Sequence, residues 1–117
     1  MPDTRRPVDL ARDDIIDQVE ALPANTPDRA TATKTALRRI VNTRGVEATV
    51  EAAADRVWYH RTSANALRSM ADNIERAAIN PSCVEQLRSR VEELRQEANQ
   101  VEQGMLSALA EDRDPFA

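Results

Sequence analysis

Two long segments separated by one proline decide the fold, and they lie in VEATVEAAADRVWYHRTSANALRSMADNIERAAINPSCVEQLRSRVEELRQEANQVEQGMLSALA at residues 46–110. The first segment, 46–79, contains neither Gly nor Pro. Residues recur in it at seven-residue steps in two series, apolar except for His60: Val50, Val57, Ala64, Ala71 and Ala78, and Ala53, His60, Leu67 and Ile74. Such a seam is typical of a long helix packed against another helix. We therefore expect one continuous helix over 46–79, with Trp58 in its interior.

The second segment has an even more regular pattern. Its apolar residues follow strict heptad spacing: Val84, Leu87, Val91, Leu94, Ala98, Val101, Met105 and Ala108. Ser82 and Glu85 have the spacing of a capping box, which predicts a helix over about 82–110. Gly104 lies inside this helix and should weaken its last turns by about 1 kcal/mol relative to Ala. The break around Pro81 is short, so the two helices should form an antiparallel hairpin.

The N-terminal third predicts two shorter helices. Pro7 can open a helix over about 8–22, which ends before Pro23. Thr26 is placed to cap a second helix with Pro27 in its first position, running to about Arg44 and burying Ala32, Ala36, Leu37, Ile40 and Val41. Gly45 is placed to end it in the left-handed conformation.

Together these segments predict an all-α fold: a long antiparallel hairpin with two shorter N-terminal helices, resembling a four-helix bundle. A chain of 117 residues has room for one domain. We expect residues 1–117 to form a single helical domain, with a polar arm at 1–6 and a polar tail at 111–117. The hairpin helices are longer than the N-terminal pair, so apolar seam should remain uncovered at the far end and available to another chain.

Composition narrows the function classes. Aromatic residues, which favour strands, make up only 3% of the chain. The net charge of −4 argues against a protein whose whole surface binds nucleic acid. Cys83 is the only cysteine, which excludes an intrachain disulfide and a CxxC metal site. We find no phosphate loop, catalytic triad or metalloprotease motif, and expect no catalytic residue, metal, cofactor or small-molecule substrate. With no signal peptide or membrane span in the sequence, we expect a cytoplasmic protein or part of an intracellularly assembled particle.

One stretch, residues 49–70, resembles a helix-turn-helix. Its small and apolar positions fit the framework of that motif. The side chains that would contact DNA are then Arg56, His60, Arg61, Thr62, Ser63, Asn65 and Arg68. The resemblance fails at the turn, where Trp58 stands in place of the usual glycine. The heptads over 50–78 explain the same residues as one helix, so both interpretations remain open.

Neighbouring aromatic residues and the hairpin seam are the candidates for protein contact. Trp58 and Tyr59 point about 100° apart on a helix, so at least one is available to a shorter helix or to a partner. His60 is either a hydrogen-bonded structural histidine or a pH-sensitive base. The predicted interface comprises Trp58, Tyr59, Leu87, Val91, Leu94, Val101 and Met105.

These patterns favour a non-enzymatic assembly protein that acts by helix–helix oligomerisation. An adaptor, connector, scaffold or virion component would fit, with a protein partner or the chain itself as the contact. The alternative is a helix-turn-helix DNA-binding regulator in which the last helix is a coiled-coil dimerisation element.

Overall fold

The computed structural model describes residues 5–77 and 81–113, and within these ranges it is all helix and connecting turns. The elements are α1 (Pro7–Ile15), a π-helical turn (Ile16–Glu20), α2 (Arg29–Arg44), α3 (Val46–Ala77) and α4 (Pro81–Arg113). No strand occurs in the described part of the chain. The predicted all-α class is confirmed.

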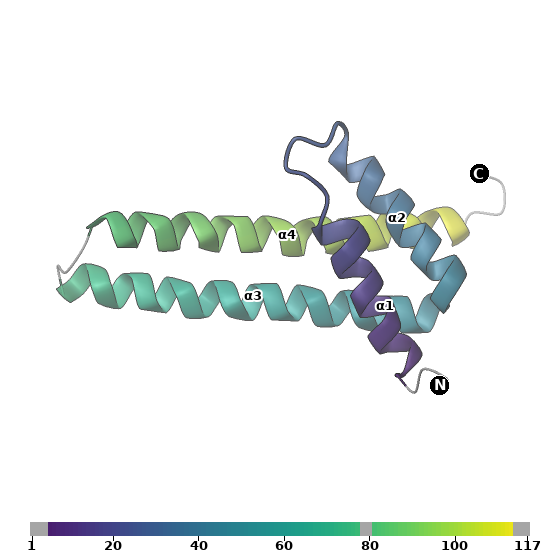
Figure 1. Ribbon diagram of the computed structural model, residues 1–117, viewed down its shortest axis with the longest axis horizontal. Helices are drawn as coiled ribbons and strands as arrows, with labels where there is room; N and C mark the ends of the chain where they lie inside the picture. The colour runs from purple at the N-terminus through teal and green to yellow at the C-terminus, as the bar shows by residue number, and fades with distance from the viewer. Residues whose placement is uncertain (1–4, 78–80, 114–117) are drawn as a thin grey trace.

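The long hairpin is the largest feature of the molecule. Helices α3 and α4 run side by side in opposite directions (Figure 1). Helix α3 continues without a break through Trp58 to Ala77, and residues 78 and 79 of the predicted helix lie outside the described residues. The heptad prediction for α4 is also confirmed. Leu87 is half-buried, and the other seam residues are buried: Val84, Val91, Leu94, Ala98, Val101, Met105 and Ala108.

The shorter helices form a second layer over one end of the hairpin. Figure 1 shows α1 and α2 lying across α3 and α4 near the start of α3, while the hairpin extends well beyond them. The molecule measures 56 × 38 × 21 Å. Since one helix with its side chains is about 10 Å across, the shortest dimension corresponds to two helix layers. The main core lies between these layers and includes Ile15, Val19, Leu37, Ile40 and Val101.

Helix α1 ends differently from the prediction of a regular helix to Leu22. Its last turn is a π-helix, in which the Ala21 N–H donates to the Ile16 carbonyl at 3.1 Å. The extra residue in this turn rotates the following side chains about the helix axis. It leaves Val19 buried in the core and Glu20 directed toward α3.

Helix α2 is capped by Asp28 instead of Thr26. Asp28 has φ +46°, and its carboxylate accepts a hydrogen bond from the Thr31 N–H at 3.3 Å. The Thr26 hydroxyl donates instead to the Pro23 carbonyl at 2.6 Å, so it stabilises the preceding turn. Helix α2 therefore begins after Asp28. It buries four of the five predicted residues, with Thr33 fully buried where Ala32 is only half-buried.

The end of α2 and both ends of α4 differ in detail from the predictions. Gly45 does have a positive φ of 95°, but its ψ of 155° lies outside the left-handed helical region. Helix α4 begins at Pro81, so Ser82 lies within its first turn instead of before it. The helix also continues to Arg113, three residues past its predicted end.

Gly104 proves to be a packing residue. A Cβ at this position would lie 2.7 Å from Thr33 Cγ2 and 3.0 Å from Leu37 Cδ1. Both atoms belong to α2, so the missing side chain is what lets α2 lie directly on α4. Gly104, which the sequence suggested would only weaken the helix, is therefore a point of close contact between α2 and α4.

Candidate functional site

An apolar groove runs between α3 and α4 on the outer face of the hairpin. Its volume is about 430 Å³. Helix α3 contributes a stripe that includes Val50, Ala54, Val57 and Trp58, and α4 contributes Met105, Leu106 and Leu109. An exposed apolar surface between two helices is typical of a site that receives another helix.

The groove faces away from α1 and α2. Asp55 of α3 accepts a hydrogen bond from Arg12 of α1 at 2.8 Å, which fixes the side of α3 that meets the second layer. Each residue of a helix advances about 100°, so Val57 points to nearly the opposite side. Likewise, Gly104 of α4 meets α2 whereas Leu106 lines the groove. The groove is thus the uncovered reverse side of the two-layer end.

Large apolar side chains in the groove are left exposed. Trp58 is 68% exposed and Leu106 is 56% exposed, although both line the groove. At one edge, Arg61 and Glu102 form an ion pair of 3.2 Å between the two helices. The groove floor is therefore apolar, and one rim carries one positive and one negative side chain that balance each other.

The structure divides the predicted interface residues into two groups. Trp58 and Tyr59 are exposed, and only Trp58 lines the groove. Tyr59 lies beside Arg56, whose guanidinium carbon is 4.8 Å from the ring centre. Within the chain, Leu87 is half-buried, and four residues are buried between the helices: Val91, Leu94, Val101 and Met105. Of these four predicted contact residues, Val91, Leu94 and Val101 are covered within the chain, whereas Met105 also lines the groove.

The far end of the hairpin does not hold the leftover seam that the sequence predicted. There, Ala64, Val91 and Leu94 form a second buried cluster, supported by Leu67. The small alanines of α3 let α4 approach closely, so the two helices cover each other. Most of the exposed large apolar residues instead lie toward the two-layer end, in the first half of α3 and at Leu106.

A buried charge cluster joins the π-helical turn to α3. Glu20 accepts two hydrogen bonds of 2.6 Å from Arg56, and its Oε1 lies 2.8 Å from His60 Nε2. Burial alone would raise the pKa of Glu20, but the Arg56 hydrogen bonds and charge, helped by His60, hold this pKa below its usual value. A carboxylate can only accept, so His60 Nε2 carries the hydrogen. This geometry fits the first of the two interpretations of His60, a hydrogen-bonded structural histidine.

The cluster continues across the hairpin to α2 and α4. Arg29 Nη2 contacts Glu97 Oε2 at 3.3 Å. Burial raises the pKa of Glu97, and the Arg29 charge only partly offsets it. Several buried polar atoms here have no hydrogen-bond partner: Arg29 Nε, His60 Nδ1, Glu97 Oε1 and Gln100 Oε1. These four residues line a cleft of about 400 Å³ beside the cluster.

In this cluster a carboxylate, a guanidinium and an imidazole contact one another. Glu20 could orient His60, but His60 is only 5% exposed and its Nδ1 contacts no donor or acceptor. The geometry favours a structural role in which the cluster fixes the π-helical turn against the hairpin.

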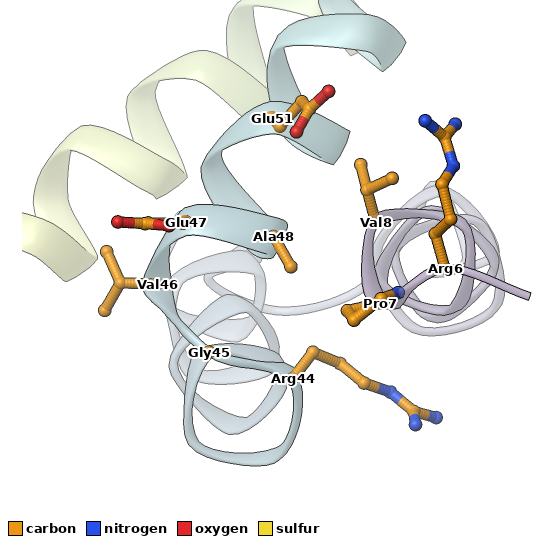
Figure 2. Close-up of a pocket in the computed structure, with 9 residues that line it drawn as sticks. All are labelled: Arg6, Pro7, Val8, Arg44, Gly45, Val46, Glu47, Ala48 and Glu51. Carbon is orange, nitrogen blue, oxygen red and sulfur yellow. The ribbon is translucent and has the colours of Figure 1, made fainter.

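Another cavity, of about 570 Å³, opens where the start of α1 meets the junction of α2 and α3. Figure 2 shows Pro7 and Val8 facing Ala48 across this opening, with Val46 and Glu47 directed away from α1. Its arginines already have partners: Arg44 Nε donates to Asp14 at 2.7 Å, and Arg6 pairs with Asp9. Both arginines that line this cavity are therefore already paired with carboxylates.

The helix-turn-helix alternative is wrong in its geometry. That motif needs a turn near Trp58, and α3 is helical throughout residues 49–70 because its seam packs continuously on α4. The predicted DNA-contacting residues also fail to form one surface. Arg56 and His60 are held by Glu20, Arg61 pairs with Glu102, and Ser63 is half-buried. The remaining three, Thr62, Asn65 and Arg68, are exposed.

Several residues of the groove and of the buried charge cluster were not predicted from the sequence. Leu106 follows the heptad residue Met105 and so falls outside the seam pattern. Leu106 and Leu109, three residues apart and displaced around α4 beside the charged Glu102, are the short apolar pattern that could have indicated another face. Glu20, Arg29 and Glu97 carry no such signal, because nothing in the spacing of residues so far apart indicates that they meet.

Comparison with known proteins gives no relative. No protein family matches the chain, and no curated protein or solved structure is detectably similar. Among residues 5–77 and 81–113, no helix is long and apolar enough to cross a membrane. Over the same residues, no group of three or more His, Cys, Asp or Glu side chains is arranged to hold a metal ion.

Proposed function

We propose that this protein is a non-enzymatic assembly subunit that docks another protein chain through the groove between α3 and α4. The observation that carries this proposal is the exposure of Trp58 and Leu106 over a continuous apolar groove. A tryptophan is the side chain most favoured as an anchor at protein interfaces, and leaving it in water forgoes about 2–3 kcal/mol of burial.

The shape of the surface supports a helical occupant. Two antiparallel helices leave a straight groove between them, and the second layer fills this groove on one face only. A helix laid in the open groove would contact the apolar stripe of α3 and that of α4 together. Its own apolar residues would need the i, i+3, i+4 and i+7 spacing of an amphipathic helix.

Duplex DNA is a weaker candidate for the partner. Two of the three arginines of α3 that the DNA interpretation needed, Arg56 and Arg61, are paired with carboxylates. Electrostatic attraction to phosphates requires positive charge that is not already neutralised. The groove itself offers an apolar floor, which suits a protein better than a phosphate backbone.

Site-specific photocrosslinking in the native host tests the proposal. A benzophenone amino acid is placed at position 58, and a matched control carries it at Ser69, which is exposed on α3 but outside the groove. We expect a covalent adduct with a protein chain from position 58 and none from position 69. Equal labelling from both positions, or no adduct from position 58, would contradict the proposal.

A further inference from the structure

The groove has a feature that points to its occupant: a projecting side chain and a depression lie on the same face. Trp58 is the largest exposed apolar residue. One turn before it, α3 carries the small residues Ala53 and Ala54, and these line the groove opposite Met105 and Leu106. A large knob next to a hole with small walls makes the face complementary to itself.

We propose that the occupant of the groove is a second copy of this chain, bound face to face about a two-fold axis. This proposal rests on the proposed function and names its partner. In such a dimer Trp58 of each copy enters the depression at Ala53 and Ala54 of the other. A two-fold interface requires one patch that fits itself, and a knob and a hole side by side meet that requirement.

The charges on the rim agree with self-association. Arg61 and Glu102 are each about half exposed and pair with each other at 3.2 Å. The rim of the groove therefore carries no excess of one sign, and a second copy would meet no like-charge repulsion there. On two-fold pairing, Arg61 of one copy can also approach Glu102 of the other, which favours the dimer over a partner without such charges.

The arrangement of the two helix layers also supports a second copy as the occupant of the groove. At the two-layer end, α3 and α4 are covered by α1 and α2 on one face and open on the other. Two copies joined at their open faces would bring four hairpin helices together, with α1 and α2 of each copy outside. The groove is short, about 17 Å along α3 from Val50 to Arg61, so we expect dissociation in the micromolar range.

The test is the mass of the purified full chain, measured by light scattering and sedimentation from about 1 to 500 μM. We expect the mass to rise with concentration and to stop at twice the 13.0 kDa of one chain. Trp58→Ala should weaken the dimer about 30-fold or more, as removal of a central anchor does. Tyr59→Ala is the matched control, because Tyr59 is 52% exposed but lies outside the groove, and it should leave the dimer unchanged.

Three results would overturn the inference. The protein stays monomeric over the whole range, or its mass grows past the dimer, or both variants change association equally. Far-ultraviolet circular dichroism establishes that each variant is folded. A monomer that still crosslinks to a different protein from position 58 would refute the second copy and keep the docking function. A monomer without any crosslink would refute both.

Discussion

At the scale of single residues, two positions matter most for how the layers fit. From the sequence, Gly104 was predicted only to weaken a helix. Its actual role depends on Thr33 and Leu37, which lie about seventy residues earlier in the chain. Glu20 was likewise one of many acidic residues in the sequence. Its pairing with Arg56 and His60 depends on the π-helical turn, which no periodicity predicts.

Gly104→Ala should destabilise the protein by about 1–2 kcal/mol. The new Cβ meets Thr33 Cγ2 at 2.7 Å, and overpacking of this kind costs more than the roughly 1 kcal/mol gained from helix propensity. Urea unfolding followed by circular dichroism measures the change. Thr33→Ser is the partner substitution, since it removes the Cγ2 atom. In the double variant Leu37 Cδ1 still lies 3.0 Å from the new Cβ, so Gly104→Ala should cost less than in the wild type without becoming favourable, and additive effects would contradict the contact.

Glu20→Gln should cost about 3 kcal/mol near pH 7, because it leaves Arg56 buried without its carboxylate. The pKa of Glu20 is lowered by folding, so its contribution exists above the unfolded value and is lost as the pH falls through the folded value. The difference between wild type and variant should therefore shrink below about pH 4. Glu97, whose pKa shifts upward, is present in both proteins and its effect largely cancels.

Urea unfolding at several pH values measures this difference. Glu93→Gln is the control, because Glu93 is exposed and its pair with Arg90 lies on the helix surface. That variant should change stability little at any pH. A difference for Glu20→Gln that stays constant from neutral to acid pH would mean that the carboxylate is not held ionised.

At the scale of elements, the hairpin was predictable because its information is local. Heptad spacing, the absence of Gly and Pro from 46–79 and the break at Pro81 all act within one or two turns. The bounds of α1 and the cap of α2 were less predictable, since both involve single residues in unusual conformations. Asp28 adopts a positive φ that sequence rules assign to Gly or Asn first.

A charge introduced at two leucines of α4 should change the stability of the protein by very different amounts. Leu94 is buried between the hairpin helices, so Leu94→Asp should cost several kcal/mol or prevent folding. Leu106 is exposed in the groove, so Leu106→Asp should change the stability of the dilute protein by less than about 0.5 kcal/mol. Thermal unfolding at low protein concentration compares them. Similar losses from both would mean that the groove is covered within the chain.

At the scale of the whole molecule, the arrangement of the layers was only partly predictable. The sequence indicated that two short helices cannot cover a long hairpin, which is correct. It could not tell that the far end covers itself through the alanines of α3, or that the open surface lies on the reverse of the covered end. That result depends on which side of each helix α1 and α2 occupy, and single-sequence patterns do not specify it.

The overhang of the hairpin beyond α1 and α2 has a consequence for amide hydrogen exchange. Beyond the end that α1 and α2 cover, α3 and α4 continue as a pair that packs on itself through Ala64, Val91 and Leu94 (Figure 1). Opening a two-helix segment exposes less apolar surface than unfolding the whole core, so its amides should exchange through smaller, local openings. We expect protection in α3 to fall steadily from Ala52 toward Ala77, and protection in α4 to rise from Val84 toward Val101. Exchange measured by mass spectrometry should therefore give a gradient along each helix, and uniform protection along both would mean that the hairpin opens only when the entire chain unfolds.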